Sequence, residues 1–165
     1  MVGRLRNMTS LYLIDNAGIL CLYRQGSKVA NNLYIGSAGG HFEHQELNDP
    51  KACILREMEE ELGLKESDIE GLTLRYITVR LRNGEIRQNY YFFGRLKEKR
   101  MLQSTEGMLK WFSYDQIPQL PMPMSAKHMI CHYIEKGRFD CNLYAGITRP
   151  DGTDFVALQD FADEK

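Results

Sequence analysis

Three glutamates on one predicted helix face are the residues whose spacing most directly suggests chemistry. Glu57, Glu60 and Glu61 stand at positions i, i+3 and i+4, so on a helix they lie on the same side. Their like charges repel, by about 0.2–0.5 kcal/mol per pair. A divalent cation would convert this repulsion into binding, because carboxylate oxygens are hard ligands that suit Mg²⁺ or Mn²⁺. Three glutamates alone favour the alternative, which is a solvated acidic helix face.

The residues around this helix complete a longer motif. Gly40 is followed after five residues by Glu46, and the run from Arg56 to Leu64 reads Arg-Glu-apolar-any-Glu-Glu-any-Gly-apolar. This pattern resembles the box of the Nudix hydrolase family. It departs from the box at two points: nine residues separate Glu46 from Arg56 where the box has seven, and Ala38 stands where the family often has proline. We interpret the first departure as a two-residue insertion, which leaves the role of Glu46 open.

The resemblance implies a role for each matching residue. Glu57, Glu60 and Glu61 match the metal-binding and general-base positions of the box, and Mg²⁺ or Mn²⁺ is the cofactor that the family implies. The backbone carbonyl of Gly40 matches a further metal ligand. Arg56 matches the arginine that pairs with the box glutamates and fixes their orientation. The family varies in which glutamate is the base, so the base is not assigned to one residue here.

A second stretch of the chain also resembles the family. Glu106 is similar to a later-loop glutamate that serves as ligand or base in part of the family. It is followed by an apolar strand containing Trp111 and by the pair Ile117-Pro118, which looks like the corner that follows this strand. Arg24, Gly39 and Gly40 are the residues that we expect to contact the substrate.

The elements that must position these residues can be read from periodicity and turn signals. Alternating apolar segments predict strands over 9–15, 18–24, 72–82 and 85–96, a short strand ending near 114, and a tail hairpin over 142–148 and 155–158. Asn83-Gly84 is the strongest hairpin signal. Capping signals predict helices over 50–62 and 125–136, the first opened by Asp49-Pro50 and closed by Gly63. Ala52, Leu55, Met58 and Leu62 are the predicted buried stripe of the first helix.

These elements predict an α+β fold, and the resemblance implies a Nudix-type αβα sandwich with a mixed sheet. The chain has 165 residues, which favours one domain over 1–165. The box occupies about 40–64 within it. Residues 138–165 are not explained by the resemblance and are interpreted as a C-terminal extension.

Composition excludes several classes of protein. Hydrophobic residues make up 43% and charged residues 26%, so intrinsic disorder is not expected. The formal net charge is −1, so the chain lacks the general positive field of a protein that binds nucleic-acid polymers. Four cysteines without CxxC spacing, no signal peptide and no membrane-length apolar run predict a reduced, cytoplasmic protein without a membrane partner.

Several other residues have both a functional and a structural interpretation. His41 and His44 are interpreted as solvent-facing loop residues, and His128 and His132 as a structural pair, although their spacing would suit zinc. The following side chains could contact phosphates or simply face solvent on their strands: Arg24, Arg80, Arg82 and Arg87. The following aromatic side chains could stack on a base, but alternating aromatics are more often core: Trp111, Tyr90, Tyr91 and Phe93.

The resemblance implies metal-dependent hydrolysis of a nucleoside diphosphate linked to another group. The compact length and the 106–118 segment look most like the MutT-like enzymes that sanitise nucleoside triphosphates, which cleave NTPs, dNTPs or oxidised purine dNTPs to a monophosphate and pyrophosphate. The alternatives are an ADP-ribose or dinucleotide pyrophosphatase and a non-catalytic module that senses a nucleotide. A small-molecule nucleotide is the expected partner, and the sequence is compatible with a homodimer.

Overall fold

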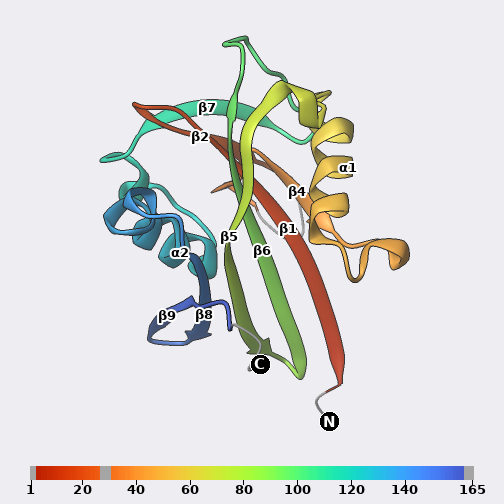
Figure 1. Cartoon of the computed structure of the whole chain (residues 1–165), viewed down its shortest axis with the longest axis vertical. Helices are drawn as coiled ribbons and strands as arrows, with labels where there is room; N and C mark the ends of the chain where they lie inside the picture. Colours follow the sequence, from red (N-terminus) through yellow and green to blue (C-terminus); the bar gives the residue numbers. More distant parts are fainter. Residues whose placement is uncertain (1–2, 27–30, 162–165) are drawn as a thin grey trace.

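The computed structural model describes residues 3–26 and 31–161, which form one mixed sheet of nine strands with a helix on each side. Figure 1 shows α1 (Pro50–Leu62) and α2 (Met124–Glu135) on opposite sides of the long strands. The predicted α+β sandwich with a mixed sheet is therefore confirmed. In the described part of the chain, no helix is both long and apolar enough to span a membrane.

The strands and short helices have the following bounds. The strands are β1 (Arg4–Ile14), β2 (Gly18–Arg24), β3 (Leu33–Ile35), β4 (Ala38–His41), β5 (Ile69–Arg82), β6 (Glu85–Leu96), β7 (Met108–Ser113), β8 (Leu143–Arg149) and β9 (Gly152–Leu158). The 3-10 helices are η1 (His44–Glu46), η2 (Glu66–Asp68), η3 (Ile117–Gln119) and η4 (Gly137–Phe139). The sheet order is β3-β2-β1-β6-β5-β8-β9, with β4 paired to β1 and β7 paired to β2.

Local capping signals determine both ends of α1. The Asp49 carboxylate accepts a hydrogen bond from the Ala52 backbone N–H at 3.0 Å, and Pro50 occupies the first turn, where no N–H donor is needed. Gly63 closes the helix with a φ of 66°, a left-handed conformation that glycine adopts without strain. The helix bounds predicted from the sequence are therefore confirmed.

The buried stripe of α1 differs in part from the prediction. Met58 and Leu62 are buried as expected, whereas Ala52 and Leu55 are only half-buried. Cys53 and Ile54 are buried instead, because the helix is turned so that the side bearing them faces the sheet. The core on this side of the sheet has the following members: Leu11, Leu13, Leu20, Ala38, Ile54, Met58, Leu62, Leu64, Ile69 and Phe92.

The β5–β6 turn and the β1–β2 turn differ in how much strand pairing follows them. Asn83 and Gly84 have φ angles of 52° and 75°, and they turn β5 antiparallel into β6 as predicted. The segments 9–15 and 18–24, which we expect to form a hairpin because only Asn16 and Ala17 separate them, pair over a short length, since β1 and β2 meet only around Leu13 and Ile14. Most of β1 runs parallel to β6 instead, and its N-terminal part extends to Arg4. This long-range pairing places β1 in the middle of the sheet.

The second helix and the tail cover the other side of the sheet. Around α2 the core is aromatic, with Tyr12, Tyr76, Tyr91, Phe93 and Tyr144 buried. The tail hairpin forms as predicted, and its β8 pairs in parallel with β5. The C-terminal extension therefore adds two strands to the same sheet.

Candidate active site

The centre of the candidate site is the contact between α1 and β4. Gly40 lies directly against the carboxylate of Glu57, so closely that a Cβ atom at position 40 would overlap the carboxylate atoms. Gly39, with a φ of 154°, leaves no room for a Cβ beside the backbone of Thr9. The paired glycines predicted to contact substrate therefore let the backbone of β4 approach the glutamates of α1.

Glu61 is the second carboxylate that faces β4. Its side chain accepts a hydrogen bond from the Gly39 backbone N–H at 3.2 Å. Burial above all, together with the nearby carboxylates of Glu57 and Glu106, raises the pKa of Glu61 to about 7, against the lowering effect of the Gly39 N–H. Three carboxyl groups thus lie close enough to one another to repel.

Glu60 occupies a different position from its two neighbours. Its side chain is 58% exposed, whereas that of Glu57 is 12% exposed. The helix places all three on one side, as predicted, but only Glu57 and Glu61 lie against β4. Glu60 stands at the outer rim of the site.

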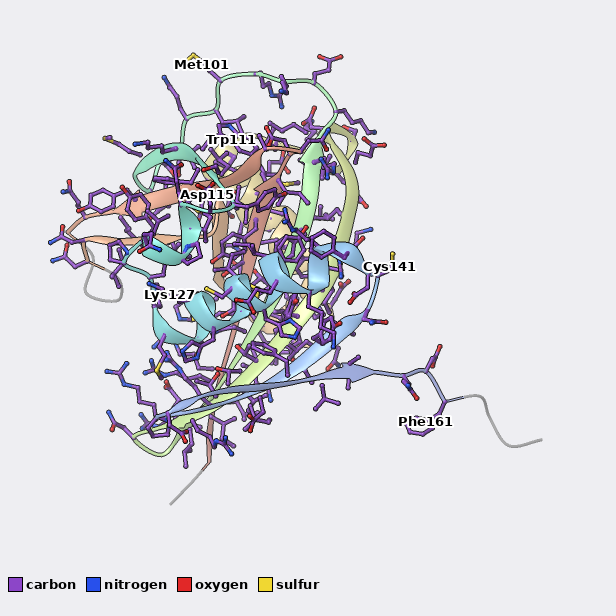
Figure 2. The ribbon with its side chains drawn as sticks, turned by 90° about the vertical axis from the view of Figure 1, so that its left-hand side faces the viewer. Met101, Trp111, Asp115, Lys127, Cys141 and Phe161 are labelled. Carbon is purple, nitrogen blue, oxygen red and sulfur yellow. The ribbon has the colours of Figure 1, made fainter. Side chains whose placement is uncertain are left out.

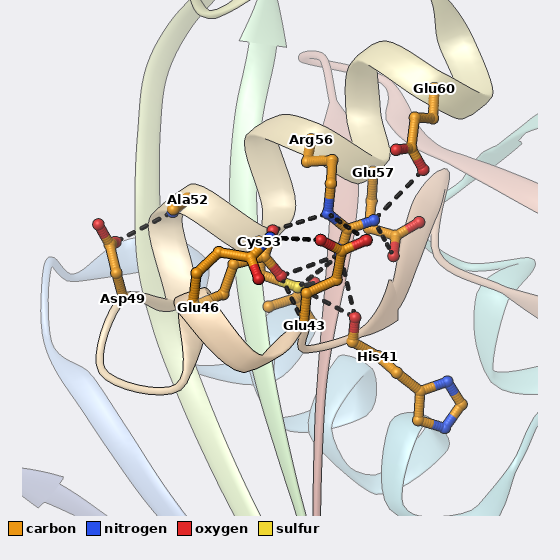
Figure 3. Close-up of polar contacts among 11 residues, drawn as sticks. His41, Glu43, Glu46, Asp49, Ala52, Cys53, Arg56, Glu57 and Glu60 are labelled. Carbon is orange, nitrogen blue, oxygen red and sulfur yellow. Dashed lines mark hydrogen bonds and ion pairs between the residues drawn. The ribbon is translucent and has the colours of Figure 1, made fainter.

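Arg56 organises the glutamates, as Figure 3 shows. Its Nη1 donates to Glu57 at 2.8 Å and to Glu60 at 3.2 Å. Its Nη2 donates to the backbone carbonyl of His41 at 3.1 Å, which joins the helix to the end of β4. These contacts support the role that the resemblance implies for Arg56, which is to orient the glutamates.

Glu46 is the main partner of Arg56, and the sequence left its role open. It is 4% exposed and accepts hydrogen bonds from Arg56 Nε at 2.6 Å and Nη2 at 2.9 Å. The hydrogen bonds from Arg56 lower the pKa of Glu46 to about 2, against the opposing effect of burial. The two extra residues before α1 therefore do not separate Glu46 from Arg56.

The loop over residues 97–107 brings a distant glutamate to the site. The Thr105 backbone N–H donates to the Glu61 carbonyl at 3.2 Å, so the loop lies over the C-terminal end of α1. Glu106 follows and forms an ion pair with Arg24 at 3.0 Å. Arg24 and Glu106 are thereby placed beside the carboxylates of α1, although 82 positions separate them in the sequence.

The donor groups of this site fit a divalent cation. In residues 3–26 and 31–161, no three His, Cys, Asp or Glu side chains form a ready-made metal cage. Mg²⁺, however, is usually bound by one or two carboxylates together with water and substrate phosphate. The crowded carboxylates of Glu57 and Glu61, beside the close approach of the Gly40 backbone, match that requirement.

Metal binding should therefore stabilise the protein. We expect Mg²⁺ or Mn²⁺ at millimolar concentration to raise the melting temperature by a few degrees, because a cation that binds only the folded chain stabilises it by mass action. NaCl at matched ionic strength should have a smaller effect, since screening is not coordination. Differential scanning fluorimetry would show this, and equal shifts from both salts would support a simple solvated acidic face.

The remaining sequence candidates lie elsewhere or have structural partners. His128 bonds Thr153 at 2.9 Å and His132 bonds Tyr76 at 2.7 Å, as expected for structural residues. His44 is exposed, whereas His41 is the last residue of β4 and accepts a hydrogen bond from Arg6. The four cysteines are free, as predicted.

A hollow of about 740 Å³ lies beside the loop over residues 97–107. It is lined by Trp111, Leu109 and Leu20 from the sheet, and by Met101 and Arg95 near the loop. Figure 2 shows Met101 and Trp111 near one end of the molecule. Trp111 is 41% exposed and is therefore not a core residue, unlike Tyr91 and Phe93.

Comparisons with known proteins agree with this geometry. A family model described as the NUDIX domain matches residues 4–133. No curated protein gives a significant match. Similar solved structures include the mutator MutT protein of Bacillus halodurans, with 21% identity, a TM-score of 0.62, and coverage of 91% of this chain and 97% of that chain.

Two further structures show how varied the similar proteins are. An Ap4A hydrolase of C. elegans has 12% identity, a TM-score of 0.63, and coverage of 84% of this chain and 100% of that chain. The NUDIX domain of Shewanella oneidensis NrtR, in complex with ADP ribose, has 15% identity, a TM-score of 0.58, and coverage of 85% of this chain and 90% of that chain. At these identities the likeness concerns the fold.

Proposed function

Since the chain belongs to the Nudix hydrolase family, which acts on nucleoside diphosphates linked to another group, we propose that it hydrolyses a nucleoside triphosphate to a monophosphate and pyrophosphate. The observation that carries the proposal is the pair of carboxylates, Glu57 and Glu61, held against the Gly39-Gly40 backbone. An oxidised purine dNTP is the substrate that we expect to be preferred.

The site residues supply the requirements of phosphoanhydride hydrolysis. A bound divalent metal would neutralise phosphate charge and lower the pKa of the attacking water. The carboxylates of Glu57, Glu60 and Glu61 and the Gly40 carbonyl are the groups that would hold it. A carboxylate of this face, or Glu106, accepts the proton of the water. Arg56 keeps the carboxylates in place throughout.

Arg24 provides positive charge on the substrate side of the site. Its guanidinium faces Glu106 at 3.0 Å, and a guanidinium can exchange a carboxylate for a phosphate with the same geometry. We propose that Arg24 contacts a substrate phosphate. The Gly39-Gly40 backbone, whose Gly39 N–H contacts Glu61, is the second group that we expect to contact the phosphates.

The base would lie on the α2 side of the sheet. The 111–128 segment meets β2 and β3, because Trp111 and Phe112 pair with Leu20 and Ile19, and the Tyr34 N–H donates to the Pro121 carbonyl at 2.8 Å. Nearby in this segment, the Ser125 hydroxyl is 2% exposed and has no hydrogen-bond partner among the described residues. A buried hydroxyl of this kind could read a polar base edge, since an unpaired buried group penalises the wrong base.

A panel of nucleotides with Mg²⁺ or Mn²⁺ tests the proposal. We expect dNTPs or NTPs to yield pyrophosphate and a monophosphate, and ¹⁸O-labelled water to label the phosphorus that is attacked. Release of inorganic phosphate as the main product, or rapid cleavage of ADP-ribose or a dinucleotide with no action on any triphosphate, would replace the proposal by its alternative. No turnover of any member would indicate a nucleotide-binding module.

A further inference from the structure

Five arginines share one face of the sheet near the β5–β6 turn. Strand register places three of them in one row across β1, β6 and β5, and the other two on either side of Glu85 in the next row. Residues two positions apart on a strand point to the same side, so both rows belong to one face. We define the arginine face as Arg4, Arg6, Arg80, Arg82 and Arg87.

The arginine face is on the same side of the sheet as α2, but beyond it. Figure 1 shows β1, β5 and β6 continuing past both helices towards the β5–β6 turn. The next row towards α2 contains Met8, Asn89 and Thr78, and the row after that contains the core residues Tyr91 and Tyr76. The face is therefore a continuation of the surface where the base would lie.

His41 connects the arginine face to the candidate active site. Its Nε2 accepts a hydrogen bond from Arg6 Nε at 2.7 Å, and its backbone carbonyl accepts one from Arg56. At about 3.3 Å per residue, the row of Arg6 lies about 13 Å along the strands from Ser10, the partner of Gly39. Gly40 meets Glu57 on the α1 side of the sheet, whereas the arginine face is on the α2 side, so a nucleotide that reaches both must pass β4.

Little negative charge opposes these arginines. Glu85 pairs with Arg87 at 2.7 Å and, more distantly, with Arg6 at 3.9 Å. In the described part of the chain no ion pair involves Arg80, and its Nε is buried without a hydrogen-bond partner. Burial lowers the pKa of Arg80, and the nearby charges of Arg87 and Arg82 lower it further.

These features distinguish the arginine face from ordinary surface charge. A solvated arginine extends into water, but the side chains of Arg6 and Arg87 are only 24% and 21% exposed. Partly desolvated guanidinium groups attract an anion more strongly than exposed ones, because the local dielectric is lower. Their planar forks also match the oxygens of phosphate.

We propose that the arginine face binds a phosphate group on the ribose of the nucleotide substrate, remote from the bond that is cleaved. This inference rests on the proposed function and narrows its substrate class to nucleotides that are phosphorylated on the ribose. A small molecule suits the face better than a nucleic-acid polymer. The chain as a whole has a net charge of −1, so it lacks the extended positive field that the repeated phosphates of a polymer require.

Binding of non-hydrolysable probes tests the inference independently of catalysis. In EDTA, adenosine and guanosine 3′,5′-bisphosphates are compared by calorimetry with the corresponding 5′-monophosphates, which lack only the 3′-phosphate. We expect the wild type to bind the bisphosphates at least 10-fold more tightly. R80Q/R87Q should abolish the difference, whereas R95Q/R149Q, which removes the same charge elsewhere, should preserve it.

The melting temperature of R80Q/R87Q shows whether this variant folds, so that a loss of binding is not mistaken for unfolding. Because the substitution relieves repulsion, we expect its melting temperature to equal or exceed that of the wild type. Equal binding of both probes by the wild type, or a preference that survives in folded R80Q/R87Q, would overturn the inference. A short single-stranded oligonucleotide that binds more than 10-fold tighter than the bisphosphates would also overturn it, in favour of a nucleic-acid surface.

Turnover separates this inference from the proposed function. The best triphosphate of the panel is compared with its 3′-phosphate, and we expect a KM about 10-fold lower for the phosphorylated form, lost in R80Q/R87Q with kcat little changed. A panel without turnover, combined with the binding preference, would contradict the proposed function and leave the phosphate site intact. Turnover with no effect of the 3′-phosphate or of R80Q/R87Q on KM would contradict the phosphate site.

Discussion

Glu61→Gln is expected to lower kcat by about 10³-fold, a loss typical of removing a catalytic acid–base or metal-binding carboxylate. The substitution keeps the shape of the side chain and an oxygen that can accept the Gly39 N–H, so the contact between α1 and β4 should persist. It removes the negative charge that the proposed chemistry needs. Steady-state kinetics with the best nucleotide of the panel would measure the loss.

The same substitution should stabilise the metal-free protein. The pKa of Glu61 is about 7 in the folded chain, against 4.5 for an ordinary glutamate, so the folded state loses stability as pH rises from about 4.5 to 7. Gln does not titrate. We therefore expect E61Q to gain on the order of 1 kcal/mol above pH 7, a value discounted because the carboxyl is partly exposed, and about 3 °C in melting temperature.

Glu59→Gln is the matched control for both measurements. Glu59 lies on the same helix and is exposed, so its substitution removes the same charge without touching the site. We expect E59Q to change kcat less than twofold and to lack the stability gain above pH 7. Turnover of E61Q within 10-fold of the wild type, or loss of folding in E61Q, would contradict the role proposed for Glu61.

The sequence predicted well those features that depend on neighbouring residues. The ends of α1 follow from Asp49-Pro50 and Gly63, and the β5–β6 turn follows from Asn83-Gly84. Each signal acts within a few residues, through a cap or a positive φ. The spacing of Glu57, Glu60 and Glu61 likewise determines that they share one helix side.

Features that depend on distant pairing could not be predicted in the same way. Alternation shows that Arg80 and Arg82 share a strand face, but nothing local shows that β1 runs parallel to β6 and places Arg6 beside Arg87. The burial of Glu46 is similar, because its partner Arg56 is found only when η1 folds against α1. A charged residue just before an insertion gave no signal that it would be buried.

Arg56 offers the largest expected effect on stability. We expect Arg56→Met to destabilise the protein by about 3 kcal/mol at pH 7, because it leaves Glu46, at 4% exposure, as a buried charge without its partner. The Met side chain retains most of the apolar volume of the arginine stem. The free energy of unfolding is measured by urea titration, with the m-value checked for constancy.

A second variant separates the loss of the ion pair from the loss of the arginine itself. E46Q/R56M removes the unpaired charge, so we expect it to recover part of the stability that R56M loses. The coupling energy between the two substitutions should then exceed the roughly 0.5 kcal/mol within which independent sites add. Lys51→Met is the matched control on the same helix. Lys51 pairs with Glu66, but both side chains are more than half exposed, so we expect a change below about 0.5 kcal/mol.

The pH dependence of this pair follows from the pKa of Glu46. The pKa is about 2 in the folded chain, below the ordinary 4.5, so the pair stabilises the protein fully above about pH 4.5 and progressively less as pH falls towards 2. A shift of this size corresponds to about 3 kcal/mol. The wild type should therefore lose its advantage over R56M as pH falls towards 2, starting above pH 4.5, because burial without a partner raises the pKa of Glu46 in the variant and lets it take up a proton first. An R56M protein as stable as the wild type at pH 7, or a difference between them that persists at pH 2, would show that the contacts of Arg56 do not hold this site together.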